Sequence, residues 1–353
     1  MPKPQTTILI LGAGGFIGSH LVEHLLKSPA YRVIGLDVSA EKLEGIDGPA
    51  FTFHERDLRE AWDLVGELVP QVDVVLDLIA YANPSIYVSS PLEVFDLNFI
   101  QNLEVAKLCV RHGVRLIQYS SAEVYGKGTE SGAYNEEHSD LVYGPIQKQR
   151  WIYAAGKALL ERVLYAHGVE GTLDYTIVRP FNFIGSRIDY LVPANAIGGP
   201  RVFPHFMSAL LTGGPIRLVD GGHVHRSFTH IEDANQAFQI LLDHPGARNG
   251  IFNIGNPANN ITIREMAGLM CELYEELVGR PAASPIVEIS GEAFYGEGYE
   301  DGDRLVPDIS RLGALGWTPK HGLRKTIRDA MRYYLDRANA GRGEDEAKIL
   351  RVG

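Results

Sequence analysis

The residues Gly12-Ala13-Gly14-Gly15-Phe16-Ile17-Gly18 follow a short apolar run, Ile8–Leu11, and open the helical pattern Ile17–Lys27. A glycine-rich turn between a strand and a helix lets the backbone approach a pyrophosphate, and the helix N-terminus adds partial positive charge. Glycines that serve only close packing are the alternative interpretation. The strand and helix on either side favour a dinucleotide site, with the predicted contacts Gly12, Gly14, Gly15, Phe16, Ile17 and Gly18.

A carboxylate, Asp37, ends the second apolar run of the chain. In this position it can accept hydrogen bonds from the adenosine ribose hydroxyls and repels a 2′-phosphate, and Val38 and Ser39 supply no guanidinium for one. The cofactor predicted from these residues is NAD rather than NADP. Asp57 and Leu58 follow the third expected strand and are predicted to lie near the adenine, while an ordinary surface carboxylate is the alternative for Asp57.

Short apolar runs alternate with helical patterns in the first half of the chain. Runs rich in Val, Ile and Leu on both faces are typical of a covered parallel sheet. Pro91 suits the first turn of its helix, and Gly113 suits the C-cap of the same helix. The pattern predicts an α/β fold of the Rossmann type, with a doubly wound parallel sheet. The expected strands are Ile8–Leu11, Arg32–Leu36, Val72–Leu78, Leu116–Tyr119 and Leu173–Val178, and the expected helices are Ile17–Lys27, Pro91–His112 and Trp151–His167.

After about Arg179 the pattern breaks into loops, isolated helices and short strands such as Ile216–Val219 and Ile251–Ile254. We predict an NAD-binding domain with the catalytic residues over 1–180 and a smaller substrate-binding region over 181–340. Some elements of the smaller region return to the first domain, and the rest is expected to pack over the carboxyl edge of the sheet. Residues 341–353 are expected to form a flexible tail.

The charge balance disfavours two kinds of partner. The 353 residues are 45% hydrophobic and 22% charged, which are ordinary values for a globular protein. With 33 basic and 44 acidic residues the net charge is −11, and such a surface repels phosphate backbones and anionic lipid. We therefore expect neither a nucleic acid nor a membrane as partner.

The cysteines and histidines predict neither a disulfide framework nor a metal site. Cys109 and Cys271 lie in apolar helical patterns without a second ligand at metal-binding spacing. The three histidines His223, His225 and His230 fit no helical zinc motif. The N-terminus lacks the features of a signal peptide, and no apolar run is long enough to cross a bilayer, so a cytoplasmic protein is expected.

Tyr153 and Lys157 are four residues apart on an expected helix, so their side chains project from one face. In such a pair the ammonium is expected to lower the pKa of the phenol, which can then take a proton from a substrate hydroxyl. Ser121 follows the preceding strand, and its hydroxyl can polarise the same oxygen. Together with NAD, these groups predict the oxidation of an alcohol by hydride transfer.

Over essentially its whole length the chain resembles the extended short-chain dehydrogenase/reductase family. Within that family it is similar to the UDP-glucuronic acid decarboxylases, a group that includes UDP-xylose synthases, the polymyxin-resistance decarboxylase domain and UDP-apiose/UDP-xylose synthases. The shared segments are Gln149-Arg150-Trp151-Ile152-Tyr153, Val178-Arg179-Pro180-Phe181-Asn182, Leu218-Val219-Asp220-Gly221-Gly222, Phe252-Asn253-Ile254-Gly255-Asn256-Pro257 and Tyr295-Gly296-Glu297-Gly298-Tyr299.

The resemblance implies an NAD-dependent enzyme that acts on UDP-glucuronic acid. The tyrosine removes the C4 hydroxyl proton as the hydride leaves, the 4-keto acid loses carbon dioxide, and optional re-reduction gives UDP-xylose instead of UDP-4-keto-pentose. A glutamate at the position of Glu123 is typical of the decarboxylases, whereas 4-epimerases usually carry a small hydroxyl residue there. The resemblance assigns catalytic positions to Ser121, Glu123, Tyr153, Lys157 and Arg304, and substrate-binding positions to Tyr87, Glu123, Asn182, Arg201, Arg217, Tyr299 and Arg304.

Two positions depart from the pattern of these relatives. Ala122 stands where they carry Ser or Cys before the glutamate. Leu305 stands where they place an arginine two residues before a proline, and Arg304 comes one residue earlier. Both changes concern the steps after oxidation. Ala82 and Ala122 also replace cysteines of the enzymes that contract the sugar ring, which disfavours apiose formation.

Several alternatives stay open at the level of sequence. The chain could be a UDP-apiose/UDP-xylose synthase, or a nucleotide-sugar 4-epimerase or 4,6-dehydratase of the same fold, and only decarboxylation releases carbon dioxide. A non-enzymatic NAD-binding regulatory protein is a further alternative, against which the intact Tyr153 and Lys157 argue. The relatives pair through two long helices, so the resemblance implies a homodimer through Pro91–His112 and Trp151–His167.

Overall fold

The computed structural model describes residues 5–128, 132–189, 191, 201–302 and 304–339. Within them a seven-stranded sheet has the order β11-β6-β5-β4-β1-β2-β3, and every pair of neighbours is parallel. This is the predicted Rossmann-type sheet. The predicted tail 341–353 lies outside the described residues. The strands of the sheet are β1 (Thr6–Leu11), β2 (Tyr31–Asp37), β3 (Phe51–Glu55), β4 (Val74–Asp77), β5 (Arg115–Tyr119), β6 (Tyr175–Pro180) and β11 (Gly250–Ile254).

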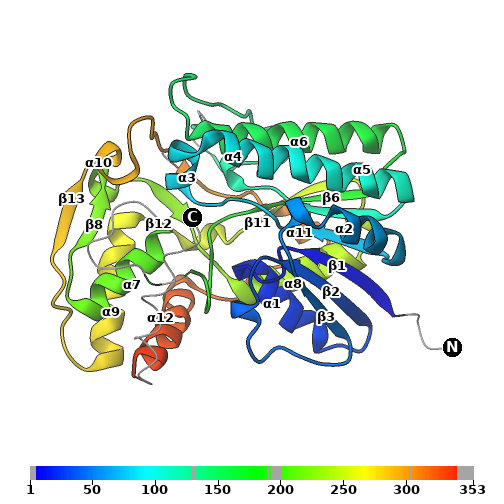
Figure 1. Cartoon of the computed structure of the whole chain (residues 1–353). Coiled ribbons are helices and arrows are strands. Elements are labelled where there is room, and N and C mark those ends of the chain that lie inside the picture. The colour runs from blue at the N-terminus through cyan, green and yellow to red at the C-terminus, as the bar shows by residue number, and fades with distance from the viewer. Residues whose placement is uncertain (1–4, 129–131, 190, 192–200, 303, 340–353) are drawn as a thin grey trace.

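Helices cover both faces of this sheet, because alternate residues of each strand are apolar on opposite sides. Ile8 and Ile10 of β1 pack with α1 and α8, whereas Leu9 and Leu11 pack with α2, α5 and α6. Figure 1 shows α4, α5 and α6 side by side in one layer and α1 with α8 in the other. The helices are α1 (Phe16–Leu26), α2 (Trp62–Leu68), α3 (Pro84–Ser89), α4 (Pro91–Phe95), α5 (Asn102–His112), α6 (Trp151–Val169) and α8 (Ile231–Asp243).

The stretch expected as one helix over Pro91–His112 contains a π-helical segment, Asp96–Gln101, between α4 and α5. Asn98 in this segment is buried, and its side chain bonds both the backbone N–H and the carbonyl of Tyr81. The wider turn therefore braces the loop after β4. Gly113 ends α5 in the left-handed region, with φ of 67°, which confirms the predicted C-cap.

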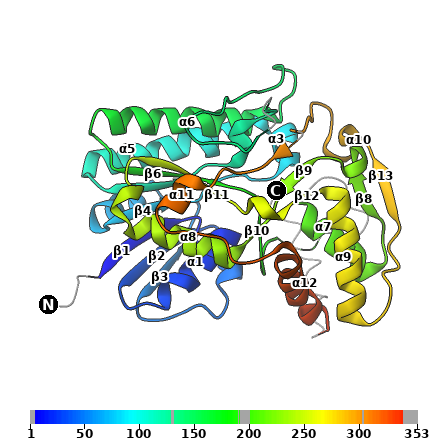
Figure 2. The same ribbon diagram turned by 180° about the vertical axis from the view of Figure 1, so that it is seen from behind.

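The smaller region lies beside the sheet, on the side away from the N-terminus (Figure 2). It contains the parallel pair β8/β13, the set β12-β9-β14 and the pair β10/β7. Its elements are β7 (Phe183–Ile184), α7 (Val202–Thr212), β8 (Ile216–Val219), β9 (His225–Ser227), β10 (Thr229–His230), β12 (Asn260–Thr262), α9 (Ile263–Val278), β13 (Ile286–Ile289), α10 (Gly291–Tyr295), β14 (Arg304–Leu305) and α12 (Leu323–Asn339). The short helix α11 (Ser310–Ala314) lies against β11 of the main sheet instead.

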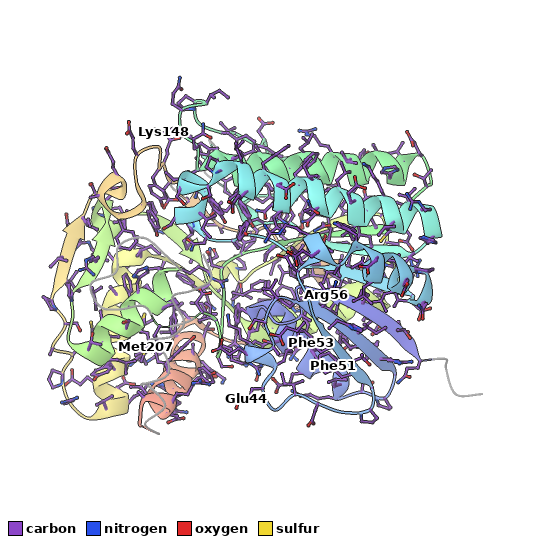
Figure 3. The ribbon with its side chains drawn as sticks, in the orientation of Figure 1. Glu44, Phe51, Phe53, Arg56, Lys148 and Met207 are labelled. Atoms are coloured by element: carbon purple, nitrogen blue, oxygen red, sulfur yellow. The ribbon has the colours of Figure 1, made fainter. Side chains whose placement is uncertain are left out.

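One strand expected in the smaller region belongs to the main sheet instead. Ile251–Ile254 forms most of β11, which pairs with β6 in parallel register from Gly250↔Thr176 to Ile254↔Pro180. The residues of β6 are almost all buried, and β11 supplies hydrogen-bond partners for the backbone N–H and C=O groups along its outer edge. A single core therefore runs through both parts, from Phe51 and Phe53 on β3 to Met207 on α7 (Figure 3).

Candidate active site

A cavity of about 570 Å³ lies between the carboxyl ends of the sheet strands and the smaller region. A volume of this order is typical of sites for small molecules and cofactors. Loops at the carboxyl edge of an open parallel sheet are the usual place for such a site. Cationic side chains from both parts of the chain line it, namely Lys42, Arg150, Lys157, Arg201, Arg217 and Arg226.

The glycine turn between β1 and α1 forms one wall of the cavity, through Gly12, Gly15 and Gly18. Gly12 has a φ of 88°, which favours glycine. A Cβ at Gly14 would lie 1.9 Å from the carbonyl oxygen of Ser39, and one at Gly18 would lie 2.1 Å from that of Gly12. The turn therefore leaves its backbone and the N-terminus of α1 open toward the cavity, where they can bind an anion. Phe16 and Ile17 also line this wall.

Asp37 lies behind the glycine turn rather than in the cavity lining. Its Oδ2 accepts a hydrogen bond from Gly14 N (2.9 Å), and its Oδ1 accepts one from Val38 N (2.7 Å). Burial raises the pKa of this carboxyl. Asp57 caps a short helical turn and forms an ion pair with Arg59 at 2.7 Å, and Leu58 is buried. The contacts predicted for Asp37, Asp57 and Leu58 with the adenosine stay predictions.

Ser121, Tyr153 and Lys157 meet in the cavity as the sequence predicts. Tyr153 forms a hydrogen bond with Ser121 at the end of β5, and its ring stacks on that of Tyr87 with centroids 4.5 Å apart. Lys157 Nζ donates to the carbonyl oxygen of Tyr119 at 3.0 Å. A phenol and a hydroxyl are thus placed to share one substrate oxygen.

The predicted lowering of the Tyr153 pKa is wrong for this arrangement. Burial raises the pKa of Tyr153 to about 12, and the hydrogen bond with Ser121 only partly opposes this. The ammonium of Lys157 is itself so buried that its pKa falls to about 8, although Asp77 partly compensates. Sequence spacing placed the two groups on one face of α6, but the effect of burial on each pKa depends on the surrounding fold.

Glu123 and Arg150 form an ion pair in the cavity, with Arg150 Nη1 donating to Glu123 Oε2 at 2.6 Å. Glu123 follows Ser121, whose side chain accepts a hydrogen bond from the Glu123 N–H and so starts the short helical turn Ala122–Tyr125. Arg150 stands three residues before Tyr153, so the two side chains share one face of the helix start. A carboxylate and a guanidinium thus lie beside the phenol.

The structure brings most of the predicted substrate residues to the cavity and leaves one outside. Arg201 forms an ion pair with Asp189 at 2.8 Å, and the ring of Tyr299 stacks on that of Tyr295. Asn182 has a positive backbone φ of 35°. Arg304 is exposed on β14 and is absent from the cavity lining among the described residues. The residues in the lining are Tyr87, Glu123, Asn182, Arg201, Arg217 and Tyr299.

Sequence reasoning missed five charged residues of the cavity, namely Lys42, Arg150, Asp189, Arg226 and Asp301. Arg226 Nη2 donates to Asp301 Oδ1 at 2.5 Å, and Arg150 Nη2 lies 3.6 Å from the same oxygen. The position of Arg150 three residues before Tyr153 is a signal that the sequence carried. Arg226 and Asp301 have no such spacing, because they come from β9 and from the loop before β14.

His230, Glu232 and His321 form a second cluster, with donor atoms within 4.8 Å of one another. The N–H of Glu232 donates to Nδ1 of His230, so the neutral ring carries its proton on Nε2, the atom through which it would bind a metal. His321 Nδ1 is hydrogen-bonded to Asp233 at 2.8 Å. This cluster joins α8 to the segment before α12, and we assign no metal to it.

A comparison with models of protein families identifies the family of this chain. Residues 8–255 match the model of the NAD dependent epimerase/dehydratase family. The chain belongs to this family. Its members use NAD, and NAD is the cofactor of this enzyme. The glycine turn fits the pyrophosphate of NAD, because Gly14 and Gly18 stand where a Cβ atom would clash with the neighbouring backbone and the turn is open toward the cavity. The predicted membership of the extended short-chain dehydrogenase/reductases and the predicted cofactor are confirmed.

Relatives of known sequence or structure agree with this assignment. The chain is 38% identical to UDP-D-apiose/UDP-D-xylose synthase of Oryza sativa subsp. japonica, over 94% of this chain and 90% of the relative. It is 39% identical to UDP-D-apiose/UDP-D-xylose synthase 1 of Arabidopsis thaliana, over 94% and 92%. The crystal structure of PbgP3 protein from Burkholderia pseudomallei matches with a TM-score of 0.84 and 34% identity, over 96% of this chain and 98% of that one. Among the described residues, no helix is both long and apolar enough to span a membrane.

A buried carboxyl at the end of β4 provides a stability test of the site. Asp77 is fully buried, its Oδ1 accepts a hydrogen bond from Ile79 N at 3.0 Å, and its Oδ2 has no hydrogen-bond partner among the described residues. Burial raises its pKa to about 6, although Lys157 partly opposes the shift. Between its ordinary pKa and about 6, the folded protein therefore holds this proton more firmly than the unfolded chain does.

We expect Asp77→Asn to gain stability relative to the unchanged protein as the pH rises. The contribution of the Asp77 proton is present at low pH and is lost as pH rises through about 6. The unchanged protein should therefore lose stability on the order of 1 kcal/mol relative to Asp77→Asn between about pH 5 and about pH 7.5. Urea unfolding at the two pH values measures the change. Asp63→Asn, at an exposed position of α2, is the control. A gap between Asp77→Asn and the unchanged protein that does not vary with pH would contradict the assignment.

Proposed function

We propose that this enzyme decarboxylates UDP-glucuronic acid after oxidation at C4, giving UDP-xylose, UDP-4-keto-pentose or both. The observation that carries the proposal is the ion pair of Glu123 and Arg150 beside Tyr153, since a neutral sugar would not need a charged pair at its reacting end. The names of the two plant relatives, which are UDP-sugar synthases, support a UDP-sugar as substrate. Arg201 and Arg217 supply guanidinium donors suited to a diphosphate.

The residues of the cavity can perform the chemistry. Tyr153 is the base that takes the proton from the C4 hydroxyl, and Ser121 donates to the same oxygen. NAD, when bound, supplies the oxidant for C4. The ketone at C4 lies β to the C6 carboxylate, so the C5–C6 bond breaks with release of carbon dioxide and its electron pair remains on the sugar as an enolate. Tyr153 and Ser121 stabilise the negative charge on the C4 oxygen, and C5 then takes up a proton.

Formation of UDP-apiose is the first alternative, because the plant relatives carry that product in their names. Ala82 lines the cavity, and Ala122, between Ser121 and Glu123, is buried. Neither side chain can exchange a proton. Ring contraction needs further proton transfers, so these two alanines favour UDP-xylose or the 4-keto sugar as product. A 4-epimerase or 4,6-dehydratase is the second alternative, and both retain all the carbon atoms of the substrate.

One incubation tests the proposal. The purified protein is mixed with UDP-glucuronic acid and NAD, products are followed by mass spectrometry, and NADH is followed by absorbance. We expect loss of one carbon dioxide from the nucleotide sugar, and accumulation of NADH shows that the keto sugar leaves before it is reduced. A product of unchanged mass and new stereochemistry would instead identify a 4-epimerase. Recovery of unchanged UDP-glucuronic acid would contradict the proposal.

We also propose that two copies of the chain pair through α4, α5 and α6. Leu92, Phe95 and Leu159 are exposed apolar side chains on α4 and α6, which lie side by side on the outer layer (Figure 1). A patch of this kind supports a protein interface. Light scattering is expected to give twice the chain mass of 38.9 kDa. The double variant Leu92→Arg with Leu159→Arg should have the mass of a single chain in the same measurement. The control Val278→Arg, at an exposed position of α9, should keep the mass of two chains. A single-chain mass for the unchanged protein would contradict the proposal.

A further inference from the structure

Asp77 is a buried carboxyl that the proposed chemistry does not use. It ends β4 and is fully buried, and Lys157 on α6 is only 1% exposed. Asp77 comes two residues after Val75, so its side chain points to the same face of the sheet, the one that α5 and α6 cover. The carboxyl and the ammonium therefore lie in the same layer, between the sheet and α6.

One carbonyl group and one amide link the two residues. Asp77 and Gln118 are register partners on the neighbouring parallel strands β4 and β5. Gln118 Nε2 donates to the carbonyl oxygens of Asp77 and Tyr119, each at 3.4 Å. Lys157 Nζ donates to the same carbonyl oxygen of Tyr119 at 3.0 Å. The ends of β4 and β5 thus hold Lys157 close to Asp77.

The carboxylate of Asp77 has few hydrogen-bond donors around it. Its Oδ1 accepts a hydrogen bond from Ile79 N at 3.0 Å, and its Oδ2 has no hydrogen-bond partner among the described residues. Burial raises the pKa of Asp77 to about 6, and the positive charge of Lys157 opposes this rise. A buried carboxylate with one donor depends on such a charge to be ionised at neutral pH.

Two carboxylates act on Lys157. Burial lowers the pKa of Lys157 to about 8, and the charges of Asp77 and Glu161 oppose this fall. Glu161 already accepts two hydrogen bonds from Arg179, at 3.0 and 2.5 Å. Cys109, a further titratable group that Asp77 influences, is a thiol whose pKa burial raises, so it stays neutral. Asp77 is thus the carboxylate whose charge is available to Lys157.

We propose that Asp77 is a positioning residue of the active site, which keeps Lys157 an ammonium at neutral pH. Lys157 lies one helical turn after Tyr153, and its charge favours the deprotonated phenol that takes the proton of the substrate hydroxyl. Between about pH 6 and about pH 8 both Asp77 and Lys157 are charged. This inference rests on the oxidation step of the proposed function and not on the release of carbon dioxide.

The first experiment follows the titration of Lys157 without any substrate. The full chain is labelled with lysine that carries ¹³C at Cε, whose NMR shift follows the protonation of Nζ, and the signal missing from Lys157→Met belongs to Lys157. We expect Asp77→Asn to lower the midpoint of this titration by about one pH unit or more, because a nearby opposite charge is lost. Asp63→Asn, at an exposed position of α2, should leave the midpoint unchanged. The same midpoint in Asp77→Asn and in the unchanged protein would overturn the proposal.

The second experiment measures the oxidation step over the same pH range, as NADH formed from UDP-glucuronic acid and NAD in a single turnover. A midpoint lower by one pH unit leaves about a fifth of the ammonium at pH 8 and nearly all of it at pH 6, so Asp77→Asn should be about fivefold slower at pH 8 and nearly unchanged at pH 6. Adding Asp77→Asn to Lys157→Met should change the rate no further. Equal slowing at both pH values, or slowing that persists without Lys157, would mean that Asp77 does not act through Lys157.

The reverse substitution tests the pair even if Asp77→Asn does not fold. Lys157→Met removes the charge that opposes the raised pKa of Asp77. The stability contributed by the Asp77 proton is present at low pH and is lost up to about pH 6 in the unchanged protein, so in Lys157→Met this loss should extend to higher pH. Urea unfolding between about pH 5 and about pH 7.5 measures it. A loss that ends at the same pH in both proteins would contradict the pairing.

The outcomes separate this inference from the proposed function. If the midpoint of Lys157 falls in Asp77→Asn but the unchanged enzyme forms no NADH from UDP-glucuronic acid, the proposed function fails and the pairing of Asp77 with Lys157 stands. If NADH forms and the midpoint does not move, only the role of Asp77 is overturned.

Discussion

Tyr153→Phe is expected to lower kcat with UDP-glucuronic acid by about 10³-fold or more, within the range that removal of a positioned base produces. The substitution removes the oxygen that accepts the C4 hydroxyl proton in the proposed mechanism. It keeps the ring that stacks on Tyr87, with centroids 4.5 Å apart, so the shape of the cavity should persist. The rate of NADH formation in a single turnover measures the oxidation step directly.

The control for this substitution lies on the same helix. Tyr165 is an exposed residue of α6, and Tyr165→Phe removes a phenol oxygen without touching the cavity. We expect it to retain full turnover. Both variants should bind NAD as the unchanged protein does, as measured by quenching of intrinsic fluorescence. Turnover of Tyr153→Phe within about tenfold of the unchanged enzyme would show that another group is the base.

Arg179→Met is expected to lower the free energy of unfolding by about 3–5 kcal/mol, the usual cost of breaking a buried ion pair by removing one partner. Arg179 Nε and Nη2 donate to Glu161 at 3.0 and 2.5 Å, and Nη1 donates to Tyr125 Oη at 2.9 Å. Tyr125 in turn donates to Asn253 of β11. The network joins β6, α6 and β11, and it holds the helix that carries Tyr153 and Lys157 against the sheet.

Most of this loss should come from the carboxylate of Glu161, which Arg179→Met leaves buried without its partner. The double variant Glu161→Leu with Arg179→Met removes both charges, so it should recover most of the lost stability. Arg324→Met breaks exposed pairs with Glu272 and Glu276 on the surface and should leave the free energy of unfolding nearly unchanged. Urea unfolding of the four proteins provides the comparison. A loss for Arg179→Met no larger than that for Arg324→Met would contradict the structural role of the pair.

The local part of the active site could be predicted from the sequence, because each group is set by residues close together in the chain. The glycine turn needs only β1 before it and α1 after it, and the spacing of Tyr153 and Lys157 needs only one helix. Ser121 lies in the cavity because it follows a strand of the sheet. The resemblance to nucleotide-sugar decarboxylases added Tyr87, Glu123 and Asn182, which also line the cavity.

Predictions failed where distant segments decide the result. The expected lowering of the Tyr153 pKa treated Lys157 as the dominant neighbour, but burial of Tyr153 against α3 and α4 has the larger effect. Arg304 was expected to serve the reacting end, yet β14 pairs with β9 and leaves this side chain exposed. Ile251–Ile254 was expected outside the main sheet, although the outer side of β6 needs a strand there.

The Rossmann-type sheet, the glycine turn and the pairing of Tyr153 with Lys157 could be predicted from the amino-acid sequence, because periodicity and short spacings are properties of neighbouring residues. The set of charged side chains that meet beside Tyr153 follows from the packing of distant segments. Arg150 precedes α6, Arg226 lies on β9 and Asp301 lies in the loop before β14, so their contact depends on how the smaller region packs on the sheet. Coulombic interactions depend on distance in space and on burial, and neither can be read from separation along the chain.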